Sequence, residues 1–227
     1  MTTNYILNIH TATEIAIVNL SDAGRTIHSS FNIDTKQHAT FLHNAIHDLV
    51  KSEGITLKDV SAVGVTSGPG SYTGIRVGLS AAKGICYALK IPLITYNSLE
   101  LIARSSIDFT KETGNLYCPM IDARRMEVYT AIYRSDMGEV EAPSAKILDE
   151  NSFIEYVNRS KIIFSGSGSK KFKNIVKAPG FYFADIEIAT EALTFFSWQK
   201  YQKKAFENVD SAKPLYLKEF QTAFKKE

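Results

Sequence analysis

The chain has 227 residues, which is enough for one large domain or two small ones. A composition of 44% hydrophobic and 22% charged residues is typical of a globular protein and excludes a disordered or fibrous chain. Lysine and arginine total 26 against 24 for aspartate and glutamate, so the net charge of +2 does not indicate a dedicated nucleic-acid or membrane-surface binder.

The first half of the sequence predicts five strands and two helices from its hydrophobic periodicity and its turn residues. In chain order these are strands at 5–9, 15–20 and 26–33, a helix over 35–52, a strand at 60–66, a glycine-rich turn at 67–74, a helix over 73–89 and a strand at 91–96. A stripe of apolar residues from Phe41 to Val50 marks the first helix, and Gly54 ends it.

The second half repeats this order of elements, although the residues of the two halves are not obviously alike. It predicts strands at 116–121, 127–133 and 140–148, a short helix over 152–158, a strand at 161–164, a weak helix, a weak strand at 181–183 and a long helix over 186–206. A β-β-β-α-β-α block that occurs twice indicates an α/β protein of two ribonuclease H-like subdomains. An unrelated α/β chain with the same order is the alternative.

The boundary between the two subdomains is expected where strand pairing restarts, near 101–105. We therefore expect the first subdomain to span 1–102 and the second to span 103–207. The C-terminal segment, about 208–227, could return to the first subdomain, and the sequence leaves this open.

The location of the protein is expected to be cytoplasmic. No run of about 18 apolar residues is present, which excludes a transmembrane helix. The first four residues include no basic region, so we expect no signal peptide. Cys86 and Cys118 lie beside apolar residues, and we expect buried reduced thiols rather than a disulfide.

A glycine-rich turn between a strand and a helix is the most distinctive local pattern. Free backbone N–H groups and the helix dipole at such a place can bind an anion. The residues that would bind it are Gly68, Gly70, Ser71 and Thr73. The glycine spacing matches neither a dinucleotide-binding motif nor a Walker A motif, and a tight turn capped by Ser71 or Thr73 is the alternative.

The helix over 73–89 has one face of small residues, because Gly74, Gly78 and Ala82 are spaced four apart. Glycine inside a helix costs roughly 0.5–1 kcal/mol relative to alanine, so two glycines on one face indicate a close packing contact. That contact could be internal, against the sheet, or with a helix of a partner, and the sequence favours neither.

The sequence contains no convincing set of catalytic or metal-binding residues. His43 and His47 share a helix face, but no carboxylate lies between them as in the zinc-binding His-Glu-x-x-His motif, so we expect a solvated face. A ribonuclease H-type nuclease needs carboxylates around two metal ions, one of them on the first strand, and that strand ends at His10. No Ser-His-Asp pattern or Gly-x-Ser-x-Gly elbow is present.

Two charged segments have a possible binding role. The turn Asp122–Arg125 could bind a partner or an anion, although a salt-bridged strand end is the simpler interpretation. The C-terminal lysines, which include Lys225 and Lys226, predict a solvated helix face, with an RNA-facing role as the alternative.

Several motifs spread along nearly the whole chain have a family resemblance. They are GPGSYTGIRVGLSAAKG at 68–84, IPL at 91–93, SLE at 98–100, MIDAR at 120–124, EVY at 127–129 and KPLYLK at 213–218. Together they closely resemble the TsaB (YeaZ-like) family, the bacterial partner subunits of the machinery that makes N6-threonylcarbamoyladenosine in tRNA. The resemblance implies an actin-like, Hsp70-like fold of two ribonuclease H-like halves.

The chain departs from the catalytic relatives of this family at the metal-binding positions. TsaD-type proteins hold a metal with the two histidines of Asn-His-x-x-Gly-His, and at 97–102 of this chain Ser98 and Ile102 stand in their places. Isoleucine cannot coordinate a metal, and serine is a poor ligand. His10 stands where the family usually has an acidic residue, and an imidazole does not help to hold magnesium for a nucleotide. The resemblance therefore implies no catalytic residue, no metal, no cofactor and no intrinsic activity.

The resemblance also implies partners. A scaffold of this kind pairs with a TsaD-type catalytic subunit, works with a TsaE-type ATPase, meets tRNA indirectly through the complex that modifies its position 37, and forms a homodimer when alone. The expected interface lies on the two helices of the first half, and an interior role is the alternative for each residue. These residues are Phe41, Leu42, Ile46, Gly74, Ile75, Gly78 and Ala82.

Two other classes of function are alternatives to the scaffold. An actin-like ATPase or small-molecule kinase would use the glycine-rich turn for phosphate, and calorimetry with ATP and magnesium would distinguish it. A ribonuclease H-type nuclease is disfavoured, because the first strand has no carboxylate.

Overall fold

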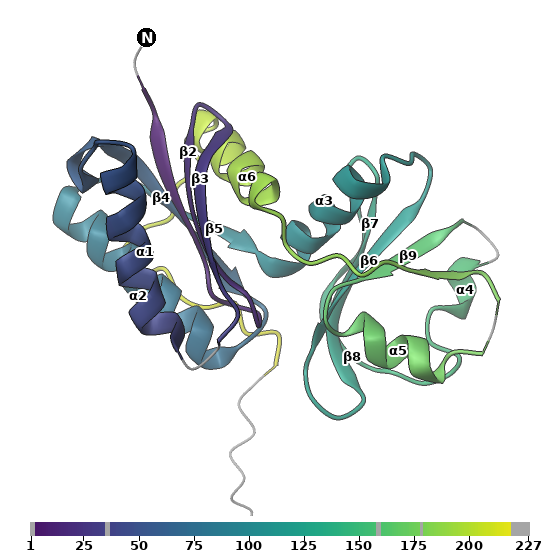
Figure 1. Ribbon diagram of the computed structural model, residues 1–227. Helices are drawn as coiled ribbons and strands as arrows, with labels where there is room; N and C mark the ends of the chain where they lie inside the picture. Colours follow the sequence, from purple (N-terminus) through teal and green to yellow (C-terminus); the bar gives the residue numbers. More distant parts are fainter. Residues whose placement is uncertain (1–2, 35–36, 158–159, 178, 219–227) are drawn as a thin grey trace, which may run out of the picture.

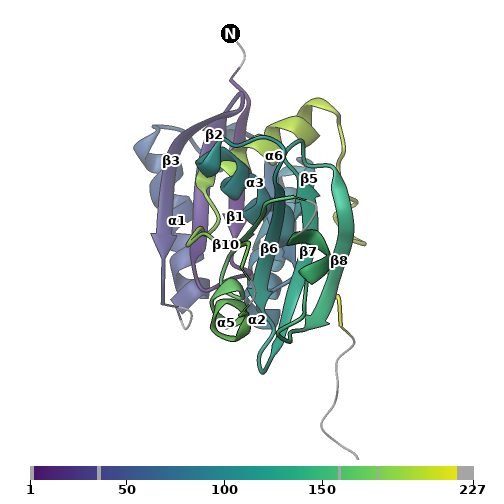
Figure 2. The ribbon, with the colours of Figure 1, turned by 90° about the vertical axis from the view of Figure 1, so that its right-hand side faces the viewer.

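Two five-stranded sheets lie side by side in the molecule, with helices between them and on their outer sides (Figure 1). The structure is a computed structural model, and it describes residues 3–34, 37–157, 160–177 and 179–218. Figure 2 shows the second sheet in front of the first.

The first sheet has the strand order β3-β2-β1-β4-β5, in which β1 pairs antiparallel with β2 and parallel with β4. Its strands are β1 (Tyr5–His10), β2 (Ala16–Asp22), β3 (Arg25–Asn32), β4 (Val60–Gly68) and β5 (Leu93–Asn97). Helices α1 (His38–Ser52) and α2 (Tyr72–Leu89) cover its outer side, and the short helix η2 (Leu57–Asp59) precedes β4. The apolar stripe of α1 packs with the outer face of the sheet in one buried cluster, as its periodicity predicted.

The second sheet has the equivalent order, β8-β7-β6-β9-β10, with β6 antiparallel to β7 and parallel to β9. Its strands are β6 (Leu116–Asp122), β7 (Glu127–Arg134), β8 (Glu139–Ile147), β9 (Ile162–Ser165) and β10 (Phe181–Phe183). Helices α4 (Ile154–Val157) and α5 (Ser169–Ile175) lie on its outer side. The repeated topology confirms the predicted α/β fold of two ribonuclease H-like subdomains.

Two helices, α3 (Ser98–Thr110) and α6 (Thr190–Gln202), form the layer between the sheets. Apolar side chains of both helices and both sheets share one buried cluster. Helix α6 falls within the range 103–207 that the sequence assigned to the second subdomain, yet it packs on the first sheet. We therefore propose a division in which α6 and residues 207–218 belong with the first sheet.

A buried polar network holds α6 on the first sheet. The side-chain amide of Asn8 donates to Asn19 Oδ1 at 2.8 Å, and the hydroxyl group of Thr194 on α6 donates to the same oxygen at 3.1 Å. Tyr96 donates its hydroxyl hydrogen to Asn8 Oδ1 at 2.5 Å, above Gly64, where a β-carbon would overlap the tyrosine. Because buried polar groups need specific partners, this network fixes where α6 lies on the sheet.

The structure differs from the expected elements in two places. Helix α3 was not predicted at all, and α6 begins at Thr190 instead of 186, because residues 186–189 cross between the sheets as extended chain. Residues 35 and 36, where the helix expected over 35–52 begins, lie outside the described residues. So does the segment 219–227, with its two lysines at 225 and 226.

The cysteine prediction is confirmed, because Cys86 and Cys118 are both buried free thiols. Burial raises the pKa of Cys86 to about 11 and that of Cys118 to about 12, so both are protonated at neutral pH. Within the described ranges, no helix combines the length and the apolar character needed to cross a membrane.

Candidate functional site

The end of β1 carries a fully buried histidine at the boundary between the subdomains. His10 Nδ1 lies 2.9 Å from the hydroxyl oxygen of Thr66, and Nε2 lies 2.8 Å from that of Thr13. Burial is the main cause that lowers the pKa of His10 to about 3, and nearby His38 lowers it further. The imidazole is therefore neutral at physiological pH, and both of its ring nitrogens are already occupied, so it offers nothing to a metal-bound nucleotide.

The buried imidazole predicts that the protein loses stability in mild acid. The unfolded chain takes up a proton near pH 6.5, whereas folded His10 does so only near pH 3, so the free energy of unfolding falls as the pH drops between these values. His10 is expected to account for about 2 kcal/mol of the loss between pH 7.5 and 5. Urea denaturation of the wild type and the His10→Gln variant at both values measures this, and an equal loss in the two proteins would contradict it.

The two positions expected for metal ligands lie in the interior. Ile102 is fully buried, and a β-carbon built at Gly166 would lie 3.2 Å from its side chain. Ser98 is also fully buried, and its hydroxyl oxygen has no hydrogen-bond partner. A hydroxyl group and an aliphatic side chain do not form a donor set for a metal ion. Within the ranges that the structure describes, no group of three or more His, Cys, Asp or Glu residues could hold one.

The glycine-rich turn packs tightly against the rest of the chain. The Ser71 N–H bonds to the carbonyl oxygen of Ala12 at 2.7 Å, and Ser71 Oγ caps α2 by accepting the N–H of Gly74 at 3.2 Å. A β-carbon at Gly68 would lie 2.7 Å from the carbonyl oxygen of Leu215, and both Gly68 and Gly70 have positive φ angles of 122° and 150°. Packing and capping therefore explain this turn, and anion binding by Gly68, Gly70, Ser71 and Thr73 stays a prediction.

Most of the residues expected at a partner interface face the interior of the first subdomain. A β-carbon at Gly74 would overlap the carbonyl oxygen of Thr11, and one at Gly78 would overlap its Oγ1. The small face of α2 thus allows the helix to approach the end of β1. Phe41 is half-buried and the others are buried, which supports the interior alternative for these residues, and a partner interface at them stays a prediction. The buried residues are Leu42, Ile46, Gly74, Ile75, Gly78 and Ala82.

The opposite face of α2 is exposed and was not identified from the sequence. It carries Tyr72, Arg76, Ser80, Gly84 and Tyr87, and we call it the outer face of α2. The guanidinium carbon of Arg76 lies 3.8 Å from the ring centroid of Tyr72, beside a shallow groove of about 400 Å³. Tyr87 is 76% exposed, and a β-carbon at Gly84 would meet no atom within 4 Å. A glycine inside a helix was the one available signal, and only the structure shows that Gly84 has no packing role within the chain.

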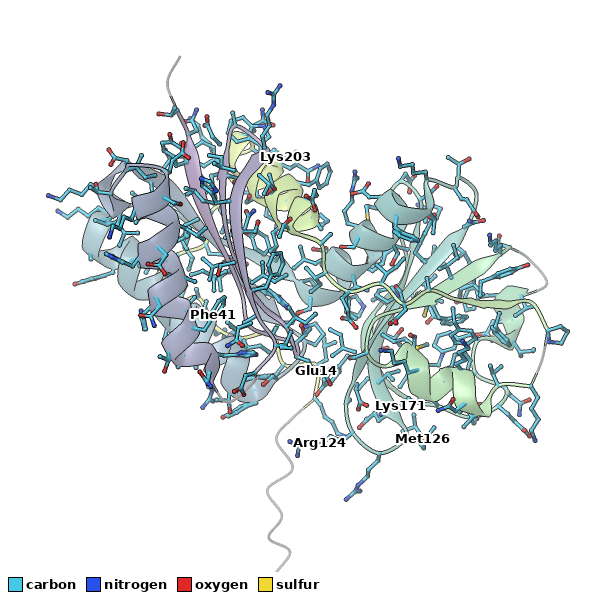
Figure 3. The ribbon with its side chains drawn as sticks, in the orientation of Figure 1. Glu14, Phe41, Arg124, Met126, Lys171 and Lys203 are labelled. Carbon is cyan, nitrogen blue, oxygen red and sulfur yellow. The ribbon has the colours of Figure 1, made fainter. Side chains whose placement is uncertain are left out.

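Helix α1 adds to this exposed side. His43 and His47 lie on its exposed face, as the sequence predicted, and Phe41 is labelled in Figure 3 near the start of the helix. Helices α1 and α2 pack against each other, so their exposed residues form one continuous surface of the first subdomain.

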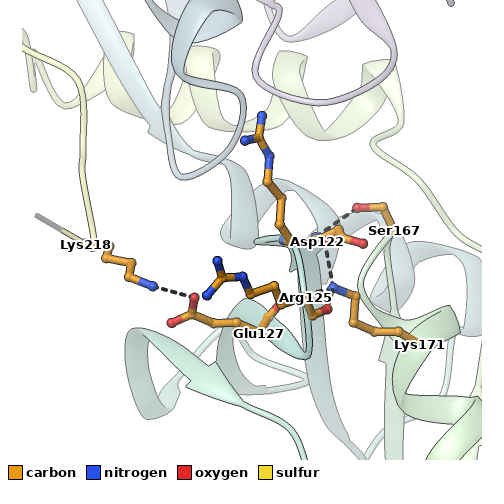
Figure 4. A network of polar contacts seen from close by, with 7 residues as sticks. Asp122, Arg125, Glu127, Ser167, Lys171 and Lys218 are labelled. Atoms are coloured by element: carbon orange, nitrogen blue, oxygen red, sulfur yellow. Dashed lines mark hydrogen bonds and ion pairs between the residues drawn. The ribbon is translucent and has the colours of Figure 1, made fainter. Parts of the chain in front are cut away.

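A tight turn joins β6 to β7 in the second subdomain, at the same end of the molecule as Glu14 (Figure 3). Asp122 Oδ1 accepts the N–H of Arg124 at 2.6 Å, and Arg124 and Arg125 have φ angles of 68° and 49°. The ammonium group of Lys171 donates to Asp122 Oδ1 and to the carbonyl oxygens of Arg125 and Glu127, at 2.7, 2.7 and 3.1 Å (Figure 4). Within the described part of the chain, neither arginine forms an ion pair.

This geometry predicts a structural role for Lys171. Its side chain is only 16% exposed and makes three hydrogen bonds, so Lys171→Met is expected to cost about 1–3 kcal/mol of stability and to speed amide exchange in the turn. Lys170→Met is the matched control, because Lys170 makes an exposed ion pair with Asp185 and is expected to matter by less than about 0.5 kcal/mol. Urea denaturation and hydrogen exchange compare the two, and equal effects would refute the role.

The duplicated topology defines a class, the actin-like α/β proteins of two ribonuclease H-like halves. A family profile described as "TsaD: tRNA N6-adenosine threonylcarbamoyltransferase" matches residues 29–218. A protein of Escherichia coli named tRNA threonylcarbamoyladenosine biosynthesis protein TsaB is 28% identical over 220 residues, which is 94% of each chain. A protein of the same name from Bacillus subtilis is 37% identical over 106 residues, 47% of this chain and 44% of that protein.

Solved structures agree on the fold. YeaZ from Pseudomonas aeruginosa superposes with a TM-score of 0.81 at 23% identity, covering 94% of this chain and 100% of that one. A second structure, described as an uncharacterized protein with similarity to peptidase YEAZ from Pseudomonas aeruginosa, gives a TM-score of 0.83 at 22% identity, covering 95% and 100%. The chain belongs to the TsaB (YeaZ-like) family.

Proposed function

We propose that the chain is a non-catalytic partner subunit in the biosynthesis of N6-threonylcarbamoyladenosine at position 37 of tRNA. Membership of the TsaB family supports the place in this biosynthesis, because its members take their name from it. The observation that carries the non-catalytic role is the buried pair Ser98 and Ile102, which stands at the expected metal-binding positions and offers no donor set. The chemistry is then supplied by a TsaD-type catalytic subunit, with a TsaE-type ATPase, in the cytoplasm.

The surface proposed for the catalytic subunit is the exposed side of α1 and α2. Its support is physical, because the outer face of α2 combines a largely exposed tyrosine, an arginine and a glycine. A β-carbon at this glycine would meet no atom within 4 Å. Aromatic and arginine side chains are the ones that contribute most at protein interfaces. In the absence of the catalytic subunit, the same surface would pair with a second copy of the chain, and tRNA would meet the chain only through the complex.

Mixing the chain with the cognate TsaD-type subunit and measuring mass by light scattering tests the partnership. The expected result is a homodimer of the chain alone and a heteromeric complex in the mixture. Two species that keep their separate masses would contradict the proposal. Calorimetry with ATP and magnesium is the companion test, since binding with turnover by the isolated chain would support the kinase alternative instead.

A further inference from the structure

Residues 207–218 run along the first subdomain, and we call them the C-terminal strap. The strap begins at the sheet edge, where the Glu207 N–H bonds to the carbonyl oxygen of Leu93 at 2.8 Å. Lys83 of α2 then donates to two strap carbonyl oxygens at 3.0 and 3.2 Å. These contacts fix most of the strap to the first subdomain.

The strap next contacts the outer face of α2. The ring of Tyr216 stacks on Tyr72 with 5.4 Å between centroids, and the Tyr216 hydroxyl oxygen accepts a hydrogen bond from Arg76 Nε at 2.9 Å. Just before it, the Leu215 N–H bonds to the carbonyl oxygen of Ser67 at 2.8 Å. Tyr216 is 45% exposed, so it lies between α2 and anything that contacts this end of the helix.

The following two residues reach the second subdomain. Leu217 packs against the buried cluster that both sheets share. Lys218 Nζ pairs with Glu127 Oε2 of β7 at 2.6 Å (Figure 4). Tyr216 thus contacts α2, while Leu217 and Lys218 contact other parts of the molecule.

We propose that the strap couples the outer face of α2 to the angle between the two subdomains. Tyr216 is its contact with the helix, and the ion pair of Lys218 with Glu127 is its contact with the second subdomain. The Lys218 side chain is 40% exposed, and a partly exposed ion pair is weak enough for a competing contact to break it. A molecule that moves Tyr216 therefore loosens the contact of the strap with the second subdomain and widens the range of angles between the subdomains.

Distance measurements between two spin labels test the coupling. The labels are attached to cysteines introduced by Lys51→Cys on α1 and Lys173→Cys on α5. Both lysines are exposed. The native thiols are buried and stay unlabelled. The expected result is a distance distribution at least twice as wide in Lys218→Ala and in Tyr216→Ala as in the parent. Lys213→Ala, an exposed lysine of the same strap, is expected to leave the width unchanged.

The labelled parent with an unaltered strap supplies a second readout. Because 1 M salt screens a partly exposed ion pair, salt is expected to widen its distance distribution. An unchanged width in Lys218→Ala and in high salt would show that the ion pair does not hold the angle, and the proposal would be wrong. If only Tyr216→Ala leaves the width unchanged, the strap does not transmit from α2, and the coupling is refuted.

Discussion

Alanine at Gly78 is expected to destabilise the protein by about 1–3 kcal/mol, although alanine is the better helix former. Its β-carbon would overlap Thr11 Oγ1 and lie tightly against Ile9 at 3.3 Å, with Val65 in ordinary contact at 3.5 Å. Alanine at Gly74 is expected to cost about 3 kcal/mol or more, because the overlap is with a backbone carbonyl oxygen that no side-chain rotation can move. Urea denaturation measures both.

A substitution at Thr11 distinguishes the packing contact of Gly78 from that of Gly74. Thr11→Ala removes the overlapping Oγ1, at a cost of about 1 kcal/mol for its lost hydrogen bond to the Gly74 carbonyl oxygen. It should therefore restore stability to the Gly78→Ala variant but not to the Gly74→Ala variant. Gly84→Ala, in open space on the same helix, is expected to stabilise by about 0.5–1 kcal/mol. If Gly78→Ala kept full stability and changed only assembly, the interior role of this glycine would be wrong.

Tryptophan at Gly84 is expected to weaken binding of the catalytic subunit at least about 100-fold, or about 2.8 kcal/mol. The bulky ring would stand on the proposed docking surface, at a position where a β-carbon meets no atom of the chain within 4 Å. Titration calorimetry with the TsaD-type subunit measures the dissociation constant, and urea denaturation checks that the fold is intact.

Lys173→Trp is the matched control for this substitution, because it places the same side chain at an exposed helix position of the second subdomain. It is expected to leave the dissociation constant unchanged. Equal affinities of the Gly84→Trp variant and the parent would place the docking surface elsewhere.

The strands and outer helices were predictable because each has a local pattern, such as the apolar stripe of α1 or the buried run of β4. Helix α3 also has an apolar face at helical spacing, but serines interrupt the pattern because they too are buried between the two sheets. Asn97, whose side chain caps the helix by accepting the N–H of Leu99 at 2.8 Å, and Glu100 in the first turn were local signals of its start. Such a helix is stable only when residues from the other half of the chain pack against it and bury it.

The candidate site shows the same limit. The spacing of Gly74 and Gly78 predicted one close contact, but could not say whether Thr11 or a partner would provide it. The exposed position of Gly84 depends on which side of α2 meets the sheet, and that follows from the tertiary structure. By contrast, the absence of metal donors at Ser98 and Ile102 was visible from residue chemistry alone, since no fold gives isoleucine a lone pair.

The most direct test of the scaffold role is the formation of N6-threonylcarbamoyladenosine on tRNA in a single-omission series. The chain, the TsaD-type subunit and the TsaE-type ATPase are combined with threonylcarbamoyl-adenylate and unmodified tRNA, and each protein is left out in turn. We expect modified tRNA in the complete mixture, a loss of modification when either the chain or the TsaD-type subunit is omitted, and no modification with the chain by itself. Modified tRNA from the chain alone would contradict it.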